Sequence, residues 1–358
     1  MSKFWSPAIH NLVPYIPGEQ PKVSNLIKLN TNENPYPPAP GVTQAVHQFE
    51  TEKLRLYPDP ESTTLVDALA QWLSVPSDHL FVGNGSDEVL AHAFMAFFRQ
   101  EKPLIKPDIT YSFYDVYANL FGITINNQPL NDDFTIDLEE YPSDNGGIIF
   151  ANPNAPTGLV LPLSDIRALL DRNTESVVLV DEAYVDFANE SAVSLLSEYP
   201  NLIVTQTFSK SQSLAGSRIG YAVAQPHLID ALNRVKNSFN SYPLDMLAIK
   251  AGVASVENSE YFLNTCEKIK QTRTVTTERL KRLGFNVLPS ATNFVFASHR
   301  YIEGAELMGF LRTKGILVRH FSRPEISHFL RITIGTDTEM DALIATLKSH
   351  PDVVELDT

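Results

Sequence analysis

The stretch that most constrains this chain runs from Asn201 to Ala224, NLIVTQTFSKSQSLAGSRIGYAVA, and places a polar loop between two apolar runs. Short apolar runs bounded by glycine and small polar residues predict two buried strands. The loop carries one lysine, Lys210, at the end of the first run. The alternative is a solvated surface lysine. A lysine at the end of a buried strand, however, usually has a chemical task, because desolvation near other cations makes the amine a nucleophile.

The neighbours of Lys210 indicate which chemistry that task belongs to. Arg218 follows in the same loop and supplies a nearby cation, and its guanidinium fork suits a phosphate group. Ser209 adds a hydroxyl beside the lysine. A lysine nucleophile next to phosphate ligands predicts pyridoxal 5'-phosphate, bound to Lys210 as a Schiff base.

A carboxylate at the end of a second buried strand supports this interpretation. The cofactor needs an acid beside its pyridine nitrogen, and Asp181 follows the apolar run 177–180 in SVVLVDEAYVDF. Open α/β sheets bind their ligands at the carboxyl ends of such strands. A plain helix N-cap is the alternative role for Asp181.

The two motifs VDEAYVDF and TFSKSQSLAGSRIGY together resemble those of the fold-type-I pyridoxal phosphate enzymes, the aspartate aminotransferase superfamily. The resemblance implies a catalytic set of Lys210 as the Schiff-base lysine, Asp181 as the partner of the pyridine nitrogen and Tyr184 as the donor to the ring 3'-oxygen. It also implies that Ser209 and Arg218 hold the cofactor phosphate.

Composition excludes several other classes of protein. The 358 residues are 43% hydrophobic, and 28 basic against 42 acidic residues give a net charge of −14, with no basic run suited to nucleic acid or an anionic membrane. The single cysteine, Cys266, fits a reducing compartment, and no apolar stretch approaches the roughly 18 residues of a membrane span. None of the nine histidines has metal-ligand spacing, so no metal site is expected. We expect a cytoplasmic enzyme that binds small molecules.

Three further segments contain candidate cofactor ligands. The run LFVGNGSDEVLAHAFMAFF predicts a strand, a turn and a helix from Ser86, so the amides of Gly85, Ser86 and Asp87 can bind phosphate at that helix end; a simple capped helix is the alternative. Tyr111, at the end of a proline-marked loop, is a candidate to cover the flat ring, or else a core aromatic. The resemblance implies that Tyr57, in the loop LRLYPDP, reaches the cofactor phosphate of the other subunit of a dimer.

One motif departs from the pattern of the superfamily. In GGIIFANPNAPTGLVLP a buried strand ends in an asparagine-proline turn, but Ala155 stands where an asparagine usually bonds the ring 3'-oxygen. Asn154 or Asn152 takes over that bond, or Tyr184 makes it alone.

The order of elements predicts an α/β protein with an aspartate-aminotransferase-like fold. We expect an N-terminal arm over residues 1–40, extended rather than helical and in contact with the small domain and a second subunit. A large cofactor domain with a mostly parallel central sheet flanked by helices should follow over residues 41–245. A smaller α+β domain should complete the chain over residues 246–358.

Candidate substrate ligands lie in the arm and near the end of the chain. Tyr15 stands between two prolines in VPYIPGE, and Arg319 and Arg331 lie on or beside the short strands ILVRHF and FLRITIG. An arginine fork suits a carboxylate or a phosphate, although exposed strand arginines are the alternative. FLRITIGT resembles the substrate-anion motif of the superfamily.

Over nearly the whole chain, LNTNENPYPP, VPYIPGE, LRLYPDP, ATNFVF and ILVRHF…FLRITIG are together similar to the histidinol-phosphate aminotransferase family. This resemblance implies a homodimer with shared active sites and amino transfer between L-histidinol phosphate and 2-oxoglutarate. It also implies that Tyr15, Arg319 and Arg331 hold the substrate phosphate. A broad aromatic aminotransferase or a threonine-phosphate decarboxylase of the same fold remains an alternative, and an inactive cofactor-binding regulatory module is a remote one.

Overall fold

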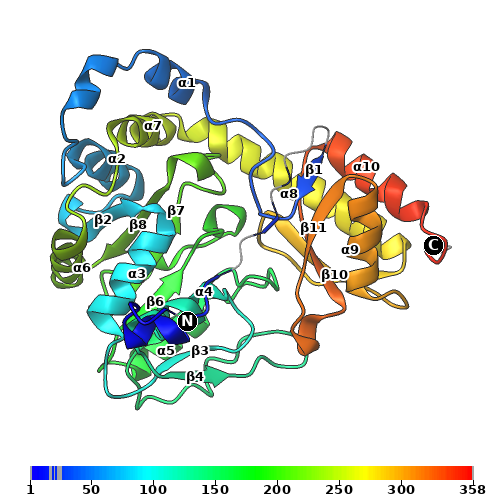
Figure 1. Cartoon of the computed structure of the whole chain (residues 1–358), viewed down its shortest axis with the longest axis horizontal. Helices are drawn as coiled ribbons and strands as arrows, with labels where there is room; N and C mark the ends of the chain where they lie inside the picture. Colours follow the sequence, from blue (N-terminus) through cyan, green and yellow to red (C-terminus); the bar gives the residue numbers. More distant parts are fainter. Residues whose placement is uncertain (1, 16–17, 20, 22–25, 357–358) are drawn as a thin grey trace.

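The structure, a computed structural model, describes residues 2–15, 18–19, 21 and 26–356 and arranges them around two β-sheets (Figure 1). The larger sheet has seven strands in the order β2-β8-β7-β6-β5-β3-β4, and the smaller has five in the order β1-β11-β12-β10-β9. The strands of the larger sheet are β2 (Leu80–Asn84), β3 (Leu104–Pro107), β4 (Ile125–Gln128), β5 (Ile148–Ala151), β6 (Val178–Asp181), β7 (Leu202–Thr207) and β8 (Ile219–Ala224). Those of the smaller sheet are β1 (Ile27–Leu29), β9 (Phe285–Val287), β10 (Phe294–His299), β11 (Ile316–His320) and β12 (Phe329–Thr333).

The larger sheet is mostly parallel and is covered on both faces. The strands from β4 to β7 pair in parallel, whereas β8 runs antiparallel to its neighbours β7 and β2. Side chains alternate between the faces: Leu202 and Val204 of β7 lie in one apolar cluster and Ile203 lies in another. A parallel strand buried on both faces needs a near-continuous apolar run, which is what its sequence contains.

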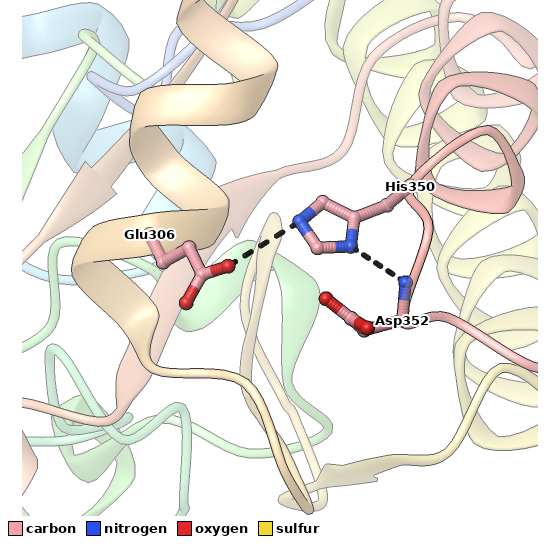
Figure 2. Close-up of side chains that lie close together, drawn as sticks. All are labelled: Glu306, His350 and Asp352. Atoms are coloured by element: carbon pink, nitrogen blue, oxygen red, sulfur yellow. Dashed lines mark hydrogen bonds and ion pairs between the residues drawn. The ribbon is translucent and has the colours of Figure 1, made fainter.

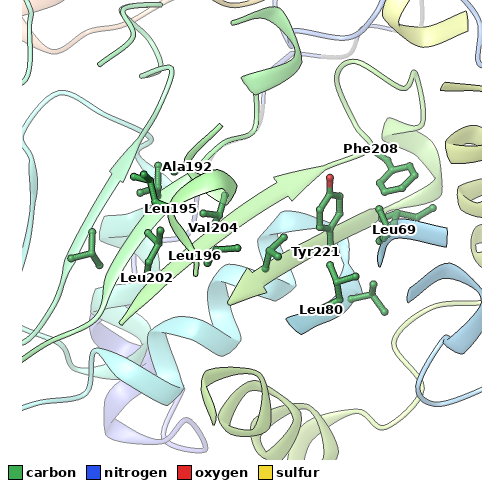
Figure 3. Packing of buried hydrophobic residues seen from close by; sticks show 14 of the residues in the cluster. Leu69, Leu80, Ala192, Leu195, Leu196, Leu202, Val204, Phe208 and Tyr221 are labelled. Carbon is green, nitrogen blue, oxygen red and sulfur yellow. The ribbon is translucent and has the colours of Figure 1, made fainter. Parts of the chain in front are cut away.

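Helices from distant parts of the chain form the two layers. One layer, packed with the cluster drawn in Figure 3, contains α2, α5 and α7, and the other contains α3, α4 and α6. The helices are α1 (Pro40–His47), α2 (Thr63–Leu73), α3 (Gly85–Phe97), α4 (Phe113–Phe121), α5 (Leu163–Arg172), α6 (Pro226–Phe239), α7 (Met246–Glu257), α8 (Ser259–Arg282), α9 (Gly304–Thr313) and α10 (Asp337–Lys348). The predicted fold class, a mostly parallel sheet flanked by helices with a smaller α+β part, is confirmed.

The smaller sheet packs against the last three helices and includes one strand from the start of the chain. Helices α8, α9 and α10 share an apolar cluster with its strands (Figure 1, right). Strand β1 pairs in parallel with β11, with Ile27 opposite Ile316. Strand β1 has the extended conformation expected of the N-terminal arm, whereas the 3-10 helix at Pro7–Asn11 departs from it.

The predicted division of the chain at residue 245, and the contact of the arm with a second subunit, remain predictions. Helix α7, which follows that position, packs its buried side against the cluster of the larger sheet. In the part of the chain that the structure describes, no helix has the length and apolarity that a membrane span requires.

At Gly220, strand β8 lies so close to the start of α3 that there is no room for a side chain. A Cβ atom there would lie 2.2 Å from the backbone nitrogen of Ser86, at the start of α3. Gly220→Ala should therefore lower the free energy of unfolding by about 1–3 kcal/mol, because backbone must shift to admit the methyl group. Gly309→Ala is the control, since its Cβ atom would meet nothing within 4 Å. Urea unfolding measures both, and equal stabilities would contradict the close approach.

Candidate active site

A cavity of about 450 Å³ opens at the carboxyl ends of β6 and β7. Asp181 ends β6, and Lys210 follows β7, so two neighbouring parallel strands bring the carboxylate and the amine to the same sheet edge. The predicted site residues that line this cavity are Ser86, Asp87, Tyr111, Asp181, Tyr184, Ser209, Lys210 and Arg218.

Asp181 is a buried carboxylate held by hydroxyl groups. Its side chain accepts hydrogen bonds from Tyr114 Oη at 2.7 Å and from Thr205 Oγ1 at 3.3 Å. Burial raises the pKa of Asp181 to about 6, although both hydrogen bonds act to lower it. Among the described residues no cation pairs with this carboxylate. A positively charged group in the cavity would therefore favour its ionised form.

The backbone around Lys210 is fixed more firmly than its amine. Asn34 Nδ2 donates to the carbonyl oxygens of Lys210 at 3.1 Å and Ser211 at 3.0 Å, and the Ser211 hydroxyl donates to Asp186. Lys210 Nζ donates to the carbonyl oxygen of Thr31 at 3.3 Å and lies 5.8 Å from the centre of the Tyr184 ring. The Lys210 backbone is therefore fixed by hydrogen bonds, whereas its amine has one long hydrogen bond and can move to a ligand in the cavity.

The start of α3 and Arg218 form the end of the cavity that suits an anion. Arg218 Nη2 bonds Asp87 Oδ2 at 2.7 Å, and Tyr111 Oη donates to Asp87 Oδ1 at 3.1 Å. The other acid of this turn, Glu88, accepts from the backbone nitrogen of Asn84 at 2.6 Å, so the carboxylates of both acids are engaged by donors. Free amides at a helix start, together with an arginine, can bind a phosphate group.

Gly85 is required at this helix start. It has a φ of +78°, and a Cβ atom there would lie 2.5 Å from Arg218 Nη2. A larger residue would be strained and would displace the guanidinium from the cavity wall. Gly85 itself is not among the cavity-lining residues.

The structure distinguishes between the candidates that could replace the missing asparagine at Ala155. The side-chain amide of Asn154 is committed to Thr110, Ile109 and Thr157 outside the cavity. Among the described residues, the side-chain amide of Asn152 bonds only the backbone of Leu161.

Tyr184 is differently placed. Its hydroxyl oxygen accepts from Asn32 Nδ2 at 2.8 Å, which leaves the hydroxyl proton to donate into the cavity. This geometry favours Tyr184 as the donor to a ring oxygen.

A second cavity, of about 250 Å³, adjoins the first and is lined by all three predicted substrate ligands. Tyr111 and Ala155 line both cavities. Arg319 and Arg331 are cross-strand partners on β11 and β12, and the ring of Tyr15 packs against Phe113 at 4.9 Å.

The two arginines make this second cavity suited to an anion. Burial and the like charge of Arg319 lower the pKa of Arg331, and the Nε of Arg331 has no hydrogen-bond partner in the described structure. An anion between the two guanidinium groups would relieve both penalties.

Tyr57 lies outside these cavities. Its side chain is 81% exposed, and its ring stacks on that of Tyr242 at 4.8 Å. It does not line the cavity of its own chain in the described structure.

Several residues of the site were not predicted. Tyr114 and Thr205 bond Asp181, and Asn32 bonds Tyr184, yet none of the three was singled out. Tyr114 lies one helical turn beyond Tyr111, a spacing that could have identified it. For Asn32 no local signal exists, because its partner is distant in the sequence.

One group of potential metal ligands lies away from both cavities, between α9 and the turn after α10 (Figure 2). His350 Nδ1 accepts from the backbone nitrogen of Asp352 at 3.2 Å, and Nε2 lies 3.7 Å from Glu306 Oε1. In a neutral imidazole the proton is therefore on Nε2, facing the carboxylate. This arrangement holds the C-terminal turn, and we interpret it as structural.

Comparisons with known proteins agree with this geometry. The family model for aminotransferase class I and II matches residues 24–347. A histidinol-phosphate aminotransferase of Chromohalobacter salexigens is 56% identical over 98% of this chain and 99% of its own length, and one of Acinetobacter baumannii is 54% identical over 97% of each. The crystal structure of histidinol-phosphate aminotransferase from Sinorhizobium meliloti in complex with pyridoxal-5'-phosphate has a TM-score of 0.88 and 25% identity, covering 98% of this chain and 99% of that one.

The raised pKa of Asp181 predicts a pH-dependent effect on stability. Its carboxyl has a pKa of about 6 in the fold against 3.8 ordinarily, so its ionised form destabilises the fold above pH 6, and this cost falls as the pH drops from 6 toward 3.8. Asp181→Asn should stabilise the ligand-free protein by about 1–3 kcal/mol at pH 8 and by roughly half as much at pH 5. Unfolding at both pH values measures this gain.

The control is Glu182→Gln, at the adjacent position. Burial raises the pKa of the Glu182 carboxyl to about 7, but Glu182 is not among the residues that line the cavity. This substitution should also stabilise the ligand-free protein at pH 8, but without weakening the binding of a cofactor in the cavity. Asp181→Asn should weaken that binding. An Asp181→Asn protein that is no more stable than the wild type at pH 8 would contradict the burial argument.

Proposed function

The chain belongs to the class I and II aminotransferase family, and we propose that it transfers the amino group between L-histidinol phosphate and 2-oxoglutarate. The products are imidazole-acetol phosphate and L-glutamate, in a step of L-histidine biosynthesis. The observation that carries the proposal is the arginine pair of the second cavity, Arg319 and Arg331, which lies beside the cavity of Lys210. The relatives that are 54% and 56% identical over nearly the full chain support the same substrate, and the fold-type-I architecture is confirmed.

The residues of the first cavity fit pyridoxal 5'-phosphate. Asp181, a buried carboxylate that pairs with no cation in the described part of the chain, suits a protonated pyridine nitrogen, and the start of α3 with Arg218 suits the phosphate. Ser86, Ser209 and the unpredicted Thr207 also line this cavity and can add hydroxyl donors. When bound, this cofactor supplies an electron sink for the pair left as a substrate Cα–H bond breaks.

The chain's own groups divide the remaining chemistry between them. Lys210 Nζ is the group that binds the cofactor and, once free, would accept the Cα proton and deliver it to the C4' carbon of the cofactor. Asp181 holds the pyridine nitrogen in its protonated form, Tyr184 donates to the ring oxygen, and Tyr111 covers the ring face. Asn34 keeps the Lys210 backbone in place while the side chain moves.

The second cavity orients the substrate through its anionic end. Arg319 and Arg331 bind the phosphate of L-histidinol phosphate, with Tyr15 donating from the arm. Arg331 also binds a carboxylate of glutamate or 2-oxoglutarate, because a guanidinium can donate two parallel hydrogen bonds to a phosphate or to a carboxylate.

We also propose a homodimer with shared active sites. Tyr57 is exposed and does not line the described cavity of its own chain; its ring stacks on that of Tyr242, which is also exposed, and Leu54 and Leu56 just before it in the sequence are exposed too. Contact with a second copy would cover these side chains and bring Tyr57 to the partner's cofactor phosphate.

Lys210→Ala removes the amine that moves the proton. We expect loss of turnover by about a thousandfold or more, while the protein still binds pyridoxal phosphate through its phosphate ligands. Turnover with histidinol phosphate and equilibrium dialysis of the cofactor measure the two properties. Normal turnover in this variant would reject the assignment of Lys210.

The substrate assignment is tested by comparing amine donors. With pyridoxal phosphate bound, histidinol phosphate should react at a far lower concentration than phenylalanine, followed by the visible absorbance of the cofactor without keto acid. Arg319→Gln should raise the KM for histidinol phosphate about 10- to 100-fold, because it removes charge-assisted hydrogen bonds, and should change that for phenylalanine little. A preference for phenylalanine would instead indicate an aromatic aminotransferase, and loss of carbon dioxide from threonine phosphate would indicate a decarboxylase.

A further inference from the structure

Helix α6 carries a buried lysine that belongs to neither cavity. Lys236 is 2% exposed, and its Nζ donates to the carbonyl oxygen of Pro60 at 2.8 Å and to Glu61 Oε1 at 3.2 Å. Burying an ammonium group costs free energy unless polar groups replace its water. Here the replacements come from one loop, so the position of that loop and the solvation of Lys236 depend on each other.

The loop that Lys236 holds is short and stiff. It comprises residues 57–62, and Pro58 and Pro60 restrict its backbone φ angles. Asp59 closes it as a turn by accepting from the backbone nitrogens of Glu61 at 3.0 Å and Thr63 at 2.8 Å. Lys236 bonds the middle of this turn, so a displacement at Pro60 would be passed along the chain to residue 57.

The residue at the start of this loop is Tyr57. Its ring stacks on Tyr242, with an interplanar angle of 25°. The residue after Tyr242, Pro243, is bonded to Asn84, whose Nδ2 donates to the Pro243 carbonyl oxygen at 3.2 Å. Asn84 directly precedes Gly85 at the anion-binding start of α3. Each tyrosine of the stacked pair therefore lies in a segment fixed by a hydrogen bond: Lys236 bonds the loop that begins at Tyr57, and Asn84, at the start of α3, bonds the residue after Tyr242.

We propose that Lys236 is a positioning residue for cofactor binding between subunits. By bonding the Pro60 carbonyl it holds the loop of residues 57–62 so that the Tyr57 hydroxyl reaches the cofactor phosphate of a second copy. This inference rests on the proposed function, in which Tyr57 serves the partner's site. We assign the positioning to the carbonyl bond because it is shorter than the contact with Glu61, at 2.8 Å against 3.2 Å, and because the Glu61 side chain is largely exposed.

The experiment measures the dissociation constant of pyridoxal phosphate for the ligand-free full chain, by absorbance titration, alongside urea unfolding. Tyr57→Phe should weaken binding about tenfold, since it removes one hydrogen bond to a charged group. Lys236→Met, which keeps the apolar stem and loses the donor, should weaken it about three- to tenfold. Glu61→Gln is the matched control: it removes the ion pair but keeps the Pro60 bond, and should change the constant less than twofold.

Combining the variants separates positioning from general stability. If Lys236 acts through Tyr57, adding Lys236→Met to Tyr57→Phe should weaken binding no further. Equal weakening by Lys236→Met in both backgrounds, or an effect of Glu61→Gln as large as that of Lys236→Met, would overturn the proposal. Lys236→Leu, which also lacks the donor, serves in the same comparison if Lys236→Met does not fold.

The titration uses no amine substrate, so its outcome does not depend on the identity of the amino donor. Unchanged binding in Tyr57→Phe would overturn both the shared site and the role of Lys236. Failure of histidinol phosphate as a donor would reject the proposed function alone.

Discussion

The carboxylate of Asp181, buried at the carboxyl end of a parallel strand, is the group around which the site is built. Its burial is tolerated because Tyr114 and Thr205 donate to it, and Thr205 lies opposite it on β7. The parallel pairing that places Thr205 there also brings the end of β7, and therefore Lys210, to the same edge of the sheet. One strand pairing thus positions both Asp181 and Lys210 at the proposed cofactor cavity.

The N-terminal segment joins the two sheets at this cavity. Strand β1 pairs with β11 of the smaller sheet, and the residues that follow it enter the site. Asn32 bonds Tyr184 and also exchanges hydrogen bonds with Thr333 of β12, while Asn34 holds the Lys210 backbone. A movement of the smaller sheet would therefore reach the cofactor residues through this segment. Arg319 and Arg331 lie on strands of the same sheet, so such a movement would also displace the two proposed substrate ligands.

The positive charges of the site are local in a chain of net charge −14. Arg218, Arg319 and Arg331 lie on cavity walls, where each meets either an acid or another arginine. Since the overall field of an acidic protein repels anions, phosphate recognition must come from short-range contacts. Arginine forks and helix-start amides on the cavity walls can supply such contacts.

The sequence by itself determined the fold class, five strands of the larger sheet (β2 and β5 to β8, but not β3 or β4), and the position of the lysine and the carboxylate at strand ends, because apolar runs and their end residues are local properties. Only the tertiary structure decided that the side-chain amide of Asn154 bonds the Ile109 carbonyl, that Asn32 bonds Tyr184, and that Lys236 bonds the loop that begins at Tyr57. These contacts join residues far apart in the chain, and a hydrogen bond depends on distance and direction in space. No local pattern records such a distance, so these roles became visible only once the chain was folded.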